Sequence, residues 1–514
     1  MRVPTLQERA SGVLLHVTAL PGRHGIGDLG DEAYRFADFL AEARQSWWQM
    51  LPVHPVGAGN SPYRSMSVFA LSPLLISLEL LEREGLLTQE ELRPDYRMRE
   101  YRVNYRVARQ FREVRLRRAH ARFSADGRPE LKQAFERYES EQAHWLRDFS
   151  LFAALKHVRA NRSWTAWPEA LRDREATALE RAWAELGEEA RYHRFLQFLS
   201  ERQWSALRAY CAQRGIGLIG DMPIYVDHES ADVWTHPDLF FLDGTRRPTC
   251  VAGVPPDAYS ATGQHWGNPL YRWDALKQQG FAWWIARLEA ELRHFDVVRL
   301  DHFIGFHRYW EIPISARTAQ EGQFRPGPGA EFFRAAQEEI GRLPLIAEDL
   351  GIVVPEVDAL RDQFTLPGMR VLQFAFDSGL ADNPHLPHHF PRNGVVYTAT
   401  HDNDTTVGWF YGSEGAEAVR RRTDLRRDQA YAMEYLGADG REINWSLIRL
   451  AFASVANTAI LPVQDLLGLG SEARINRPGT PKGNWEWRML ANTLTPYLAE
   501  RLRRTTETYG RVRA

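Results

Sequence analysis

The sequence predicts an α/β protein: a closed (β/α)₈ TIM barrel with a helical insertion and a loop-rich insertion over the C-terminal face of the barrel. Eight short apolar segments recur along the chain, separated by helical patterns or by stretches rich in Gly and Pro. Several are nearly continuous hydrophobic runs without polar alternation, as expected for parallel strands that are buried on both faces. Eight such strands favour a sheet that closes on itself.

The predicted strands and helices alternate along the chain. The strands are Gly12–His16, Trp47–Pro52, Gly217–Asp221, Val297–Asp301, Leu345–Glu348, Met369–Phe374, Val395–Thr400 and Ala456–Gln464. A helix over Asp31–Ala43 places Ala33, Phe36 and Leu40 on one face, and a second helix over Pro355–Phe364 begins with proline. Their order predicts that both helices belong to the outer ring of the barrel.

Two gaps between strands are too long for ordinary crossovers. Residues 72–214 are helical by pattern and dense in Arg and Glu, which predicts an inserted subdomain; its basic run Arg112–Arg118 is interpreted as a solvated helix face. Residues 222–295 are rich in Gly, Pro and aromatic residues and are predicted to form a loop-rich insertion over the active site. Residues 1–71, 215–221 and 296–514 then supply the first part, the third strand and the remainder of the barrel.

Composition narrows the class of protein. The 64 Lys and Arg residues nearly balance the 66 Asp and Glu residues, so no global basic field exists to bind nucleic acid. Cys211 and Cys250 are too few for a disulfide framework and are interpreted as buried thiols in a reducing compartment. No signal peptide and no apolar run of about 20 residues is recognised. We therefore expect a soluble cytoplasmic protein with no membrane partner; the oligomeric state is not predicted.

Four carboxylates follow predicted strands: Asp221, Asp301, Glu348 and Asp402. Any one of them could cap a helix or pair with a buried base. Because barrel chemistry takes place at the C-terminal ends of the strands, four like charges at one rim favour catalysis or metal binding. The run Asp402–Asp404 resembles a cation site, but the EF-hand spacing, HExxH and CxxC are all absent. We expect neither a metal nor another cofactor.

Glycoside cleavage requires a pair of carboxyl groups, and Asp301 and Glu348 on consecutive strands suit it. Arg299 lies two residues before Asp301, so both side chains should point the same way, which would keep Asp301 ionised as a nucleophile. Glu348 ends an apolar strand, where poor solvation should raise its pKa and keep it protonated as a general acid. His401 and Asp402 offer a donor and an acceptor to neighbouring sugar hydroxyls.

The motifs RLDH (299–302), AED (347–349) and THDN (400–403) resemble those of the α-amylase clan. The chain is similar over nearly its whole length to 4-α-glucanotransferases (amylomaltases) of glycoside hydrolase family 77. The segments that carry this likeness are GNSPYRSMSVFA (59–70), GDMPIYV (220–226), GVPPDAYSATGQHWGNPLY (253–271) and NRPGTPKGNWEWR (476–488). The resemblance implies the roles of nucleophile, general acid/base and transition-state stabiliser for Asp301, Glu348 and Asp402.

The resemblance also implies sugar contacts. Arg299 and His401 would support the reacting sugar, Tyr63 would stack on it, Asp221 matches the aspartate of the third strand, and Trp266 would be a mouth-loop contact. Core packing, turn capping and loop anchoring remain alternatives for Tyr63, Asp221 and Trp266 respectively. Gln464, Asn476 and Asn484 could either contact sugar or hold loops. In the segment 253–271, Tyr259 joins Trp266 as an aromatic that could cover a sugar face.

The resulting hypothesis is an enzyme that transfers α-1,4-glucan segments to the 4-hydroxyl of glucose or of another glucan by a retaining mechanism. Its expected partners are maltooligosaccharides and starch or glycogen-type glucan. An α-1,4-glucan hydrolase would use the same residues, and a catalytically inactive glucan-binding barrel would be marked by loss of a carboxylate. None of the three carboxylates is missing.

Overall fold

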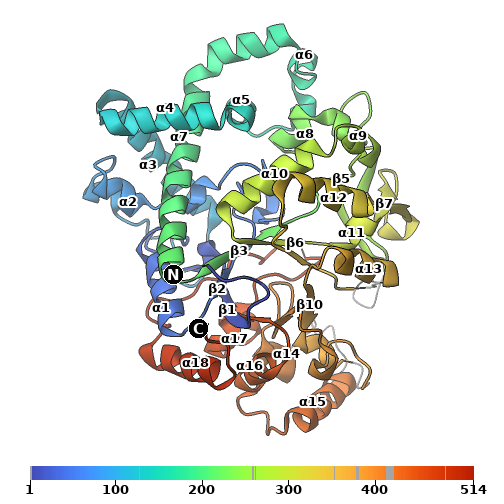
Figure 1. The fold of residues 1–514 in the computed structure, drawn as a ribbon. Helices are drawn as coiled ribbons and strands as arrows, with labels where there is room; N and C mark the ends of the chain where they lie inside the picture. Colours follow the sequence, from blue (N-terminus) through green and yellow to red (C-terminus); the bar gives the residue numbers. More distant parts are fainter. Residues whose placement is uncertain are drawn as a thin grey trace.

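The computed structural model describes residues 3–126, 128–256, 260, 262–351, 354–377, 381–412, 422–480 and 482–513. Eight parallel strands form a closed barrel in the order β1-β12-β11-β10-β9-β6-β3-β2, which confirms the predicted fold class (Figure 1). Each of the eight barrel strands overlaps a predicted one. They are β1 Ala10–Leu14, β2 Trp47–Gln49, β3 Gly217–Met222, β6 Val297–Leu300, β9 Leu345–Ala347, β10 Gly368–Val371, β11 Gly394–Tyr397 and β12 Thr458–Pro462.

The barrel interior is a packed core whose buried residues include Trp47, Ile219, Ile346 and Ile460. Two glycines make room for Trp47. A Cβ atom on Gly12 would lie 2.4 Å from the Cβ of Trp47, and one on Gly217 would lie 2.5 Å from its ring. Because the centre is filled, substrate can bind only at an end of the barrel.

The outer ring holds the two helices expected from the sequence, α1 Asp31–Glu42 and α13 Pro355–Gln363. The first turn of α1 carries Asp31 and Glu32, where negative charge suits the helix dipole. Further helices follow the later strands. They are α10 Ala282–His294, α12 Gly329–Ile340, α14 Thr406–Tyr411, α15 Arg422–Leu436, α16 Ile443–Ala453, α17 Val463–Leu467 and α18 Pro496–Thr508.

Between β2 and β3 the chain is helical, as predicted. The helices are α2 Leu78–Arg83, α3 Tyr105–Asp126, α4 Pro129–Glu141, α5 Ala143–Val158, α6 Glu169–Arg172 and the 38-residue α7 Ala176–Gln213, which returns to the barrel (Figure 1). The interpretation of Arg112–Arg118 as a solvated face was wrong for Arg112. This side chain is buried, because it packs against the start of the chain and donates to the Ile76 carbonyl and to Asp28.

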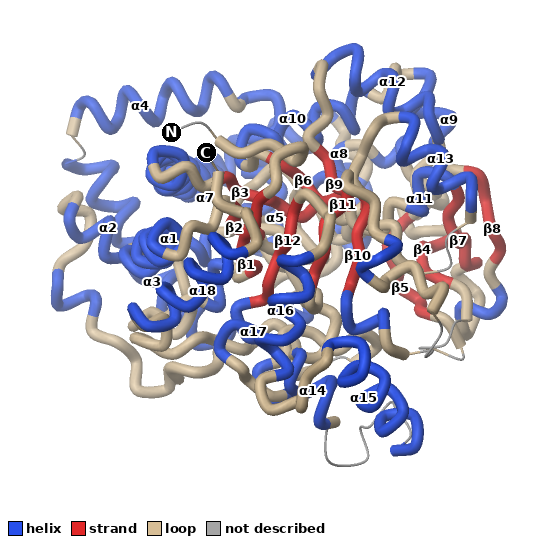
Figure 2. The backbone as a smooth tube through the Cα atoms, turned by 60° about the horizontal axis from the view of Figure 1, so that its bottom comes forward, coloured by secondary structure: helices blue, strands red, loops and turns tan. Residues whose placement is uncertain are grey.

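Between β3 and β6 the chain is more regular than its composition indicates. It contains α8 Ala231–Thr235, α9 Trp273–Gln278 and α10, together with strands β4 Cys250–Val254 and β5 Gln264–Pro269. After β6 come α11 Ile304–His307 and the strands β7 Arg308–Pro313 and β8 Gln323–Pro326. These four strands form one antiparallel sheet, β5-β4-β7-β8, beside the barrel (Figure 2). Within residues 222–295, the composition thus did not reveal β4, β5 and α10.

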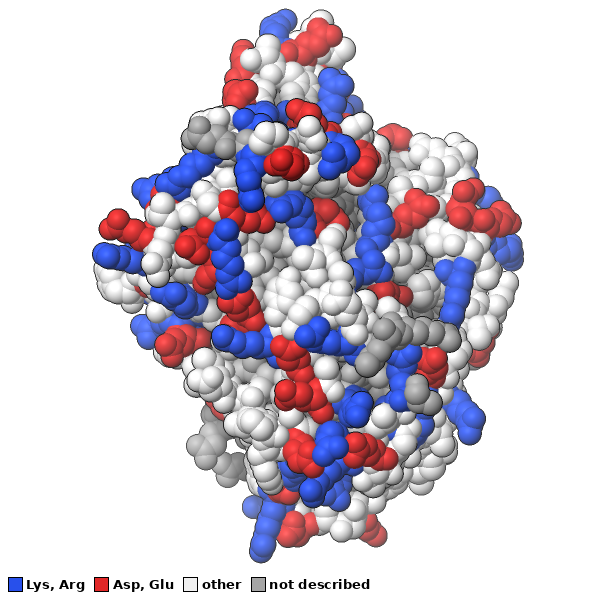
Figure 3. All heavy atoms as spheres, turned by 60° about the vertical axis from the view of Figure 1, so that its left-hand side comes forward, with Lys and Arg blue, Asp and Glu red and all other residues white. Residues whose placement is uncertain are grey.

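The surface carries both signs of charge in close mixture. On the face that Figure 3 shows, basic and acidic side chains alternate, in keeping with the near balance of charged residues. Cys211 and Cys250 are free and buried, as expected. Among the described helices, none combines the length and apolar character needed to span a bilayer.

Candidate active site

Strand register brings the predicted site residues together. Asp221 on β3 is the register partner of Arg299 on β6. Leu300 on β6 pairs with Ala347 on β9, so the next residue of each strand, Asp301 and Glu348, leaves the barrel rim at neighbouring points. The C-terminal ends of β3, β6 and β9 thus place three carboxylates and one guanidinium side by side.

Arg299 is the electrostatic centre of this group. Its side chain is 5% exposed, and Nη1 donates to Asp221 Oδ1 at 2.7 Å and to Asp301 Oδ1 at 2.9 Å. The contact with Asp301 confirms the expected same-side geometry. Burial raises the pKa of Asp221, while the positive charge of Arg299 opposes that rise. One buried guanidinium therefore stabilises two carboxylates of unequal exposure.

Tyr63 lies in the site and not in the core. Its side chain is half-buried, and its hydroxyl donates to Asp221 Oδ2 at 2.7 Å and lies 2.7 Å from His401 Nε2. Its ring centroid is 5.2 Å from that of His401. Asp221 accepts from Tyr63 and Arg299 through different oxygens, so it acts as a buried anchor for both. The turn-capping alternative for Asp221 is not what these contacts show.

Glu348 is held by backbone donors. Its Oε2 accepts from the His302 N–H at 2.7 Å and its Oε1 from the Leu350 N–H at 3.1 Å. Burial raises the pKa of Glu348 to about 8; Arg299 opposes the rise and the charge of Asp301 adds to it. A carboxyl group with such a pKa is largely protonated at neutral pH, which is the state that a general acid needs.

Asp402 reaches the site differently, because it lies five residues beyond the end of β11. Its side chain is 45% exposed, and Oδ2 lies 3.4 Å from His401 Nε2. Its Oδ1 accepts from Asn476 Nδ2 at 2.6 Å. Asn484, by contrast, bonds Thr480 and the Arg477 N–H within its own loop. The structure thus separates two asparagines for which the sequence left the choice open.

Trp266 lies at one border of this group, on strand β5 and not in a loop as predicted. Its ring meets the His302 ring edge to face with centroids 4.9 Å apart, and its carbonyl accepts from Arg64 Nη2 at 2.7 Å. The indole is half-buried, so part of it faces solvent. Tyr259 lies outside the described residues.

Two residues of the site were missed by sequence reasoning. His302 has a left-handed backbone with φ of 54°, and this turn aims its N–H at Glu348. Trp485, with φ of 65°, places its ring 5.7 Å from that of Tyr63 and 6.1 Å from that of His401. Left-handed conformations of such bulky residues are strained and tend to occur at functional sites. The RLDH and NWEWR motifs pointed to these segments without revealing the strain.

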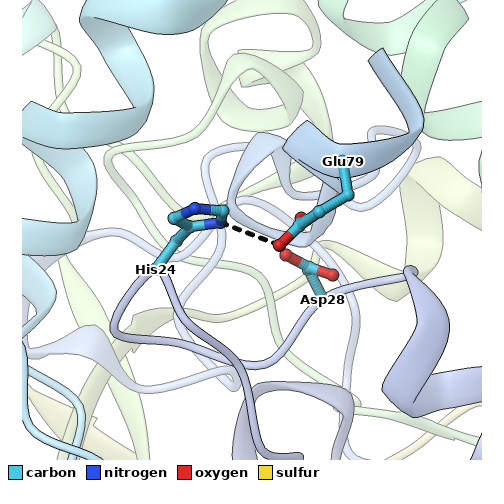
Figure 4. A group of neighbouring side chains, drawn as sticks. All are labelled: His24, Asp28 and Glu79. Atoms are coloured by element: carbon cyan, nitrogen blue, oxygen red, sulfur yellow. Dashed lines mark ion pairs between the residues drawn. The ribbon is translucent and has the colours of Figure 1, made fainter. Parts of the chain in front are cut away.

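A second charged cluster lies apart from the residues above. Among the described residues, His24, Asp28 and Glu79 form the one group with the spacing of a metal site (Figure 4). His24 Nδ1 lies 3.4 Å from Glu79 Oε1, and Arg112 Nη2 donates to Asp28 Oδ2 at 2.7 Å. Arg112 therefore already supplies positive charge beside the two carboxyl groups of this cluster. These four residues tie α2 and α3 to the loop after β1.

The chain resembles known proteins over its full length. The sequence model of glycoside hydrolase family 77, described as 4-alpha-glucanotransferase, matches residues 15–493. The chain belongs to the 4-alpha-glucanotransferase family. It is 48% identical to the 4-alpha-glucanotransferase of Thermus thermophilus over 98% of this chain and 99% of the relative, and 49% identical to that of Synechocystis sp. over the same shares.

A solved structure agrees with this membership. The amylomaltase from Streptococcus agalactiae in complex with acarbose superposes with a TM-score of 0.93 at 37% identity, covering 98% of this chain and 100% of that one. The chain is accordingly an enzyme with the transferase activity of its family, and the comparisons do not support the hydrolase alternative.

Proposed function

We propose that this enzyme cleaves α-1,4-glucan and transfers the glycosyl segment to the 4-hydroxyl of an acceptor glucan through a covalent intermediate on Asp301. The observation that carries this proposal is the pairing at the barrel rim: a carboxylate bonded to Arg299 beside a carboxyl group with a pKa of about 8. These two environments suit a nucleophile and a general acid respectively.

In the first step, the ionised Asp301 attacks the anomeric carbon while Glu348 donates its proton to the departing glycosidic oxygen. The C1–O4 bond breaks and a bond forms between C1 and a carboxylate oxygen of Asp301. Arg299 donates a hydrogen bond to the nucleophile before attack and can do so again when Asp301 is released. Asp402, with His401, would stabilise positive charge on the sugar ring in the transition state.

In the second step, Glu348 is a carboxylate and takes the proton from the 4-hydroxyl of the acceptor, which attacks C1 and releases Asp301. The configuration at C1 is retained because it inverts twice. Tyr63 supplies a flat ring at the sugar, and Trp266 offers a half-buried indole for the acceptor side. Tyr259, which lies outside the described residues, is proposed for the same role from its place in the sequence alone.

The proposed substrates are maltooligosaccharides and starch or glycogen-type glucan, without a cofactor. The amylomaltase from Streptococcus agalactiae is in complex with acarbose, which supports an oligosaccharide substrate. We also propose a cytoplasmic location, which the free thiols of Cys211 and Cys250 favour, since reducing compartments keep thiols unpaired. The division into a barrel with insertions at 72–214 and 222–295 remains a proposal as well.

Incubation with maltotriose as sole substrate tests the function. Transfer yields glucose together with a ladder of longer oligosaccharides, and the number of reducing ends stays constant because each cleaved bond is replaced. Glucose and maltose alone, with rising reducing ends, would show hydrolysis. Asp301→Ala serves as the control, because it should produce neither pattern.

A further inference from the structure

The three carboxylates of the site are supported in three different ways. Asp301 follows β6 directly and bonds Arg299, and Glu348 follows β9 directly and accepts two backbone N–H groups. Asp402 stands five residues beyond β11 and is the most exposed of the charged groups around Arg299. A side chain on a loop needs a partner to fix its direction, because its own strand cannot do so.

Asn476 supplies that partner. Its Nδ2 donates to Asp402 Oδ1 at 2.6 Å, shorter than the usual N–H···O distance of about 2.9 Å. The other oxygen has a weaker contact, since His401 Nε2 lies 3.4 Å from Oδ2 but 2.7 Å from the Tyr63 hydroxyl. The Nδ2 atom of an amide can only donate a hydrogen bond. A carboxylate accepts at both oxygens, whereas one oxygen of a protonated carboxyl group also donates.

The segment that carries Asn476 is itself bonded to the loop of Asp402. The Asn476 N–H donates to the His401 carbonyl at 3.1 Å. Arg474 bridges both segments: Nε donates to the Asn476 carbonyl and Nη2 to the Asp402 carbonyl, each at 2.7 Å. Nearby, Ser471 Oγ donates to Asp404 Oδ2 at 2.7 Å. The amide of Asn476 is thus oriented before substrate arrives.

We propose that Asn476 is a positioning residue that aims the Asp402 carboxylate at the reacting sugar. This inference rests on the proposed function, in which Asp402 stabilises the transition state. Asn476 touches Asp402 and acts through it. Loop holding alone, by contrast, would be served by the Asn476 backbone N–H and the Arg474 side chain and would not need the amide.

Asparagine-to-aspartate substitution separates the two roles. In Asn476→Asp, two carboxyl groups at hydrogen-bond distance share one proton, so Asp402 loses its full charge until that proton leaves. We expect kcat to fall about 10- to 100-fold near neutral pH, KM to change little, and the acid limb of kcat/KM to move up by at least about one pH unit. Asn476→Ala should lower kcat without the same movement of the limb.

The matched control is Asn393→Asp. Asn393 directly precedes β11, at the N-terminal end of the barrel strands, and its Nδ2 donates to the Thr365 carbonyl. The pH profile of Asn393→Asp should therefore equal that of the wild type. Melting temperatures identify any variant that fails to fold. If Asn476→Asp does not fold, the kcat of Asn476→Ala tests the inference. An unmoved acid limb in folded Asn476→Asp, or unchanged kcat in Asn476→Ala, overturns the inference. The variant Asp402→Asn distinguishes a wrong role for Asn476 from a wrong proposed function. If Asp402→Asn retains activity, the role proposed for Asp402 itself is wrong.

Discussion

Replacing Arg299 by methionine should destabilise the protein far more than replacing an exposed arginine with the same number of partners. The methionine side chain keeps much of the apolar stem but removes the guanidinium that bonds Asp221 and Asp301. Asp221 has no exposed side-chain surface, so water cannot replace the lost partner. Asp301 is 27% exposed and loses less.

The expected magnitude follows from that difference in exposure. Breaking a buried ion pair by removing one member costs about 3–5 kcal/mol, because a charge stays buried without compensation. The double variant Arg299→Met with Asp221→Asn removes the stranded charge, so most of this loss should return. Arg503→Met is the control: Arg503 also pairs with two carboxylates, Glu500 and Glu507, but its side chain is 38% exposed, so water can replace the lost contacts and the stability should change little.

Unfolding in urea, followed by tryptophan fluorescence, measures these differences as shifts of the midpoint at a constant slope. We expect the Arg299→Met midpoint to be much lower than that of Arg503→Met, with the double variant between Arg299→Met and the wild type. A loss in Arg299→Met no larger than in Arg503→Met, or a double variant less stable than Arg299→Met, would refute the charge argument.

Three further predictions concern pH and acceptor choice. Since Glu348 must be protonated for the first step and its pKa is raised to about 8, kcat/KM for transfer should decline above about pH 8. Burial alone would raise the pKa of Glu79, but His24 lowers it to about 2; the resulting stability is complete above pH 4.5 and is lost as pH falls towards 2. In Glu79→Gln, the free energy of unfolding should depend less on pH between those values. An unchanged pH dependence would refute a stabilising contact between His24 and Glu79. Trp266→Ala should raise the ratio of hydrolysis to transfer, measured as reducing ends against redistributed oligosaccharides, and an unchanged ratio would place acceptor selection elsewhere.

The barrel could be predicted because parallel strands buried on both faces leave a strong sequence signal. Runs such as Val297–Leu300 and Leu345–Ala347 contain almost only apolar residues before the functional carboxylate. The four-stranded sheet beside the barrel could not be found in this way. Its strand β8, Gln323–Pro326, is exposed throughout, and β5, Gln264–Pro269, is polar and half-buried, so neither shows a hydrophobic pattern.

Site residues were predictable where one strand fixes two side chains, as for Arg299 and Asp301. They were not predictable where contact depends on tertiary structure. Asn476 meets Asp402 across 74 residues of chain, and no local spacing signals that contact. The left-handed backbone of His302 was not predictable either, because it accompanies a hydrogen bond from the His302 N–H to Glu348, a residue on another strand end.

We propose Asp301 as the nucleophile and Glu348 as the general acid. The most direct measurement uses an activated glucosyl donor whose leaving group needs no protonation, followed by peptide mass spectrometry. Glu348→Gln should form the intermediate without acid assistance and then release it slowly for lack of a base, so one glucosyl group should accumulate on Asp301. Asp301→Ala should show no adduct. A glucosyl group on any residue other than Asp301 would contradict the account.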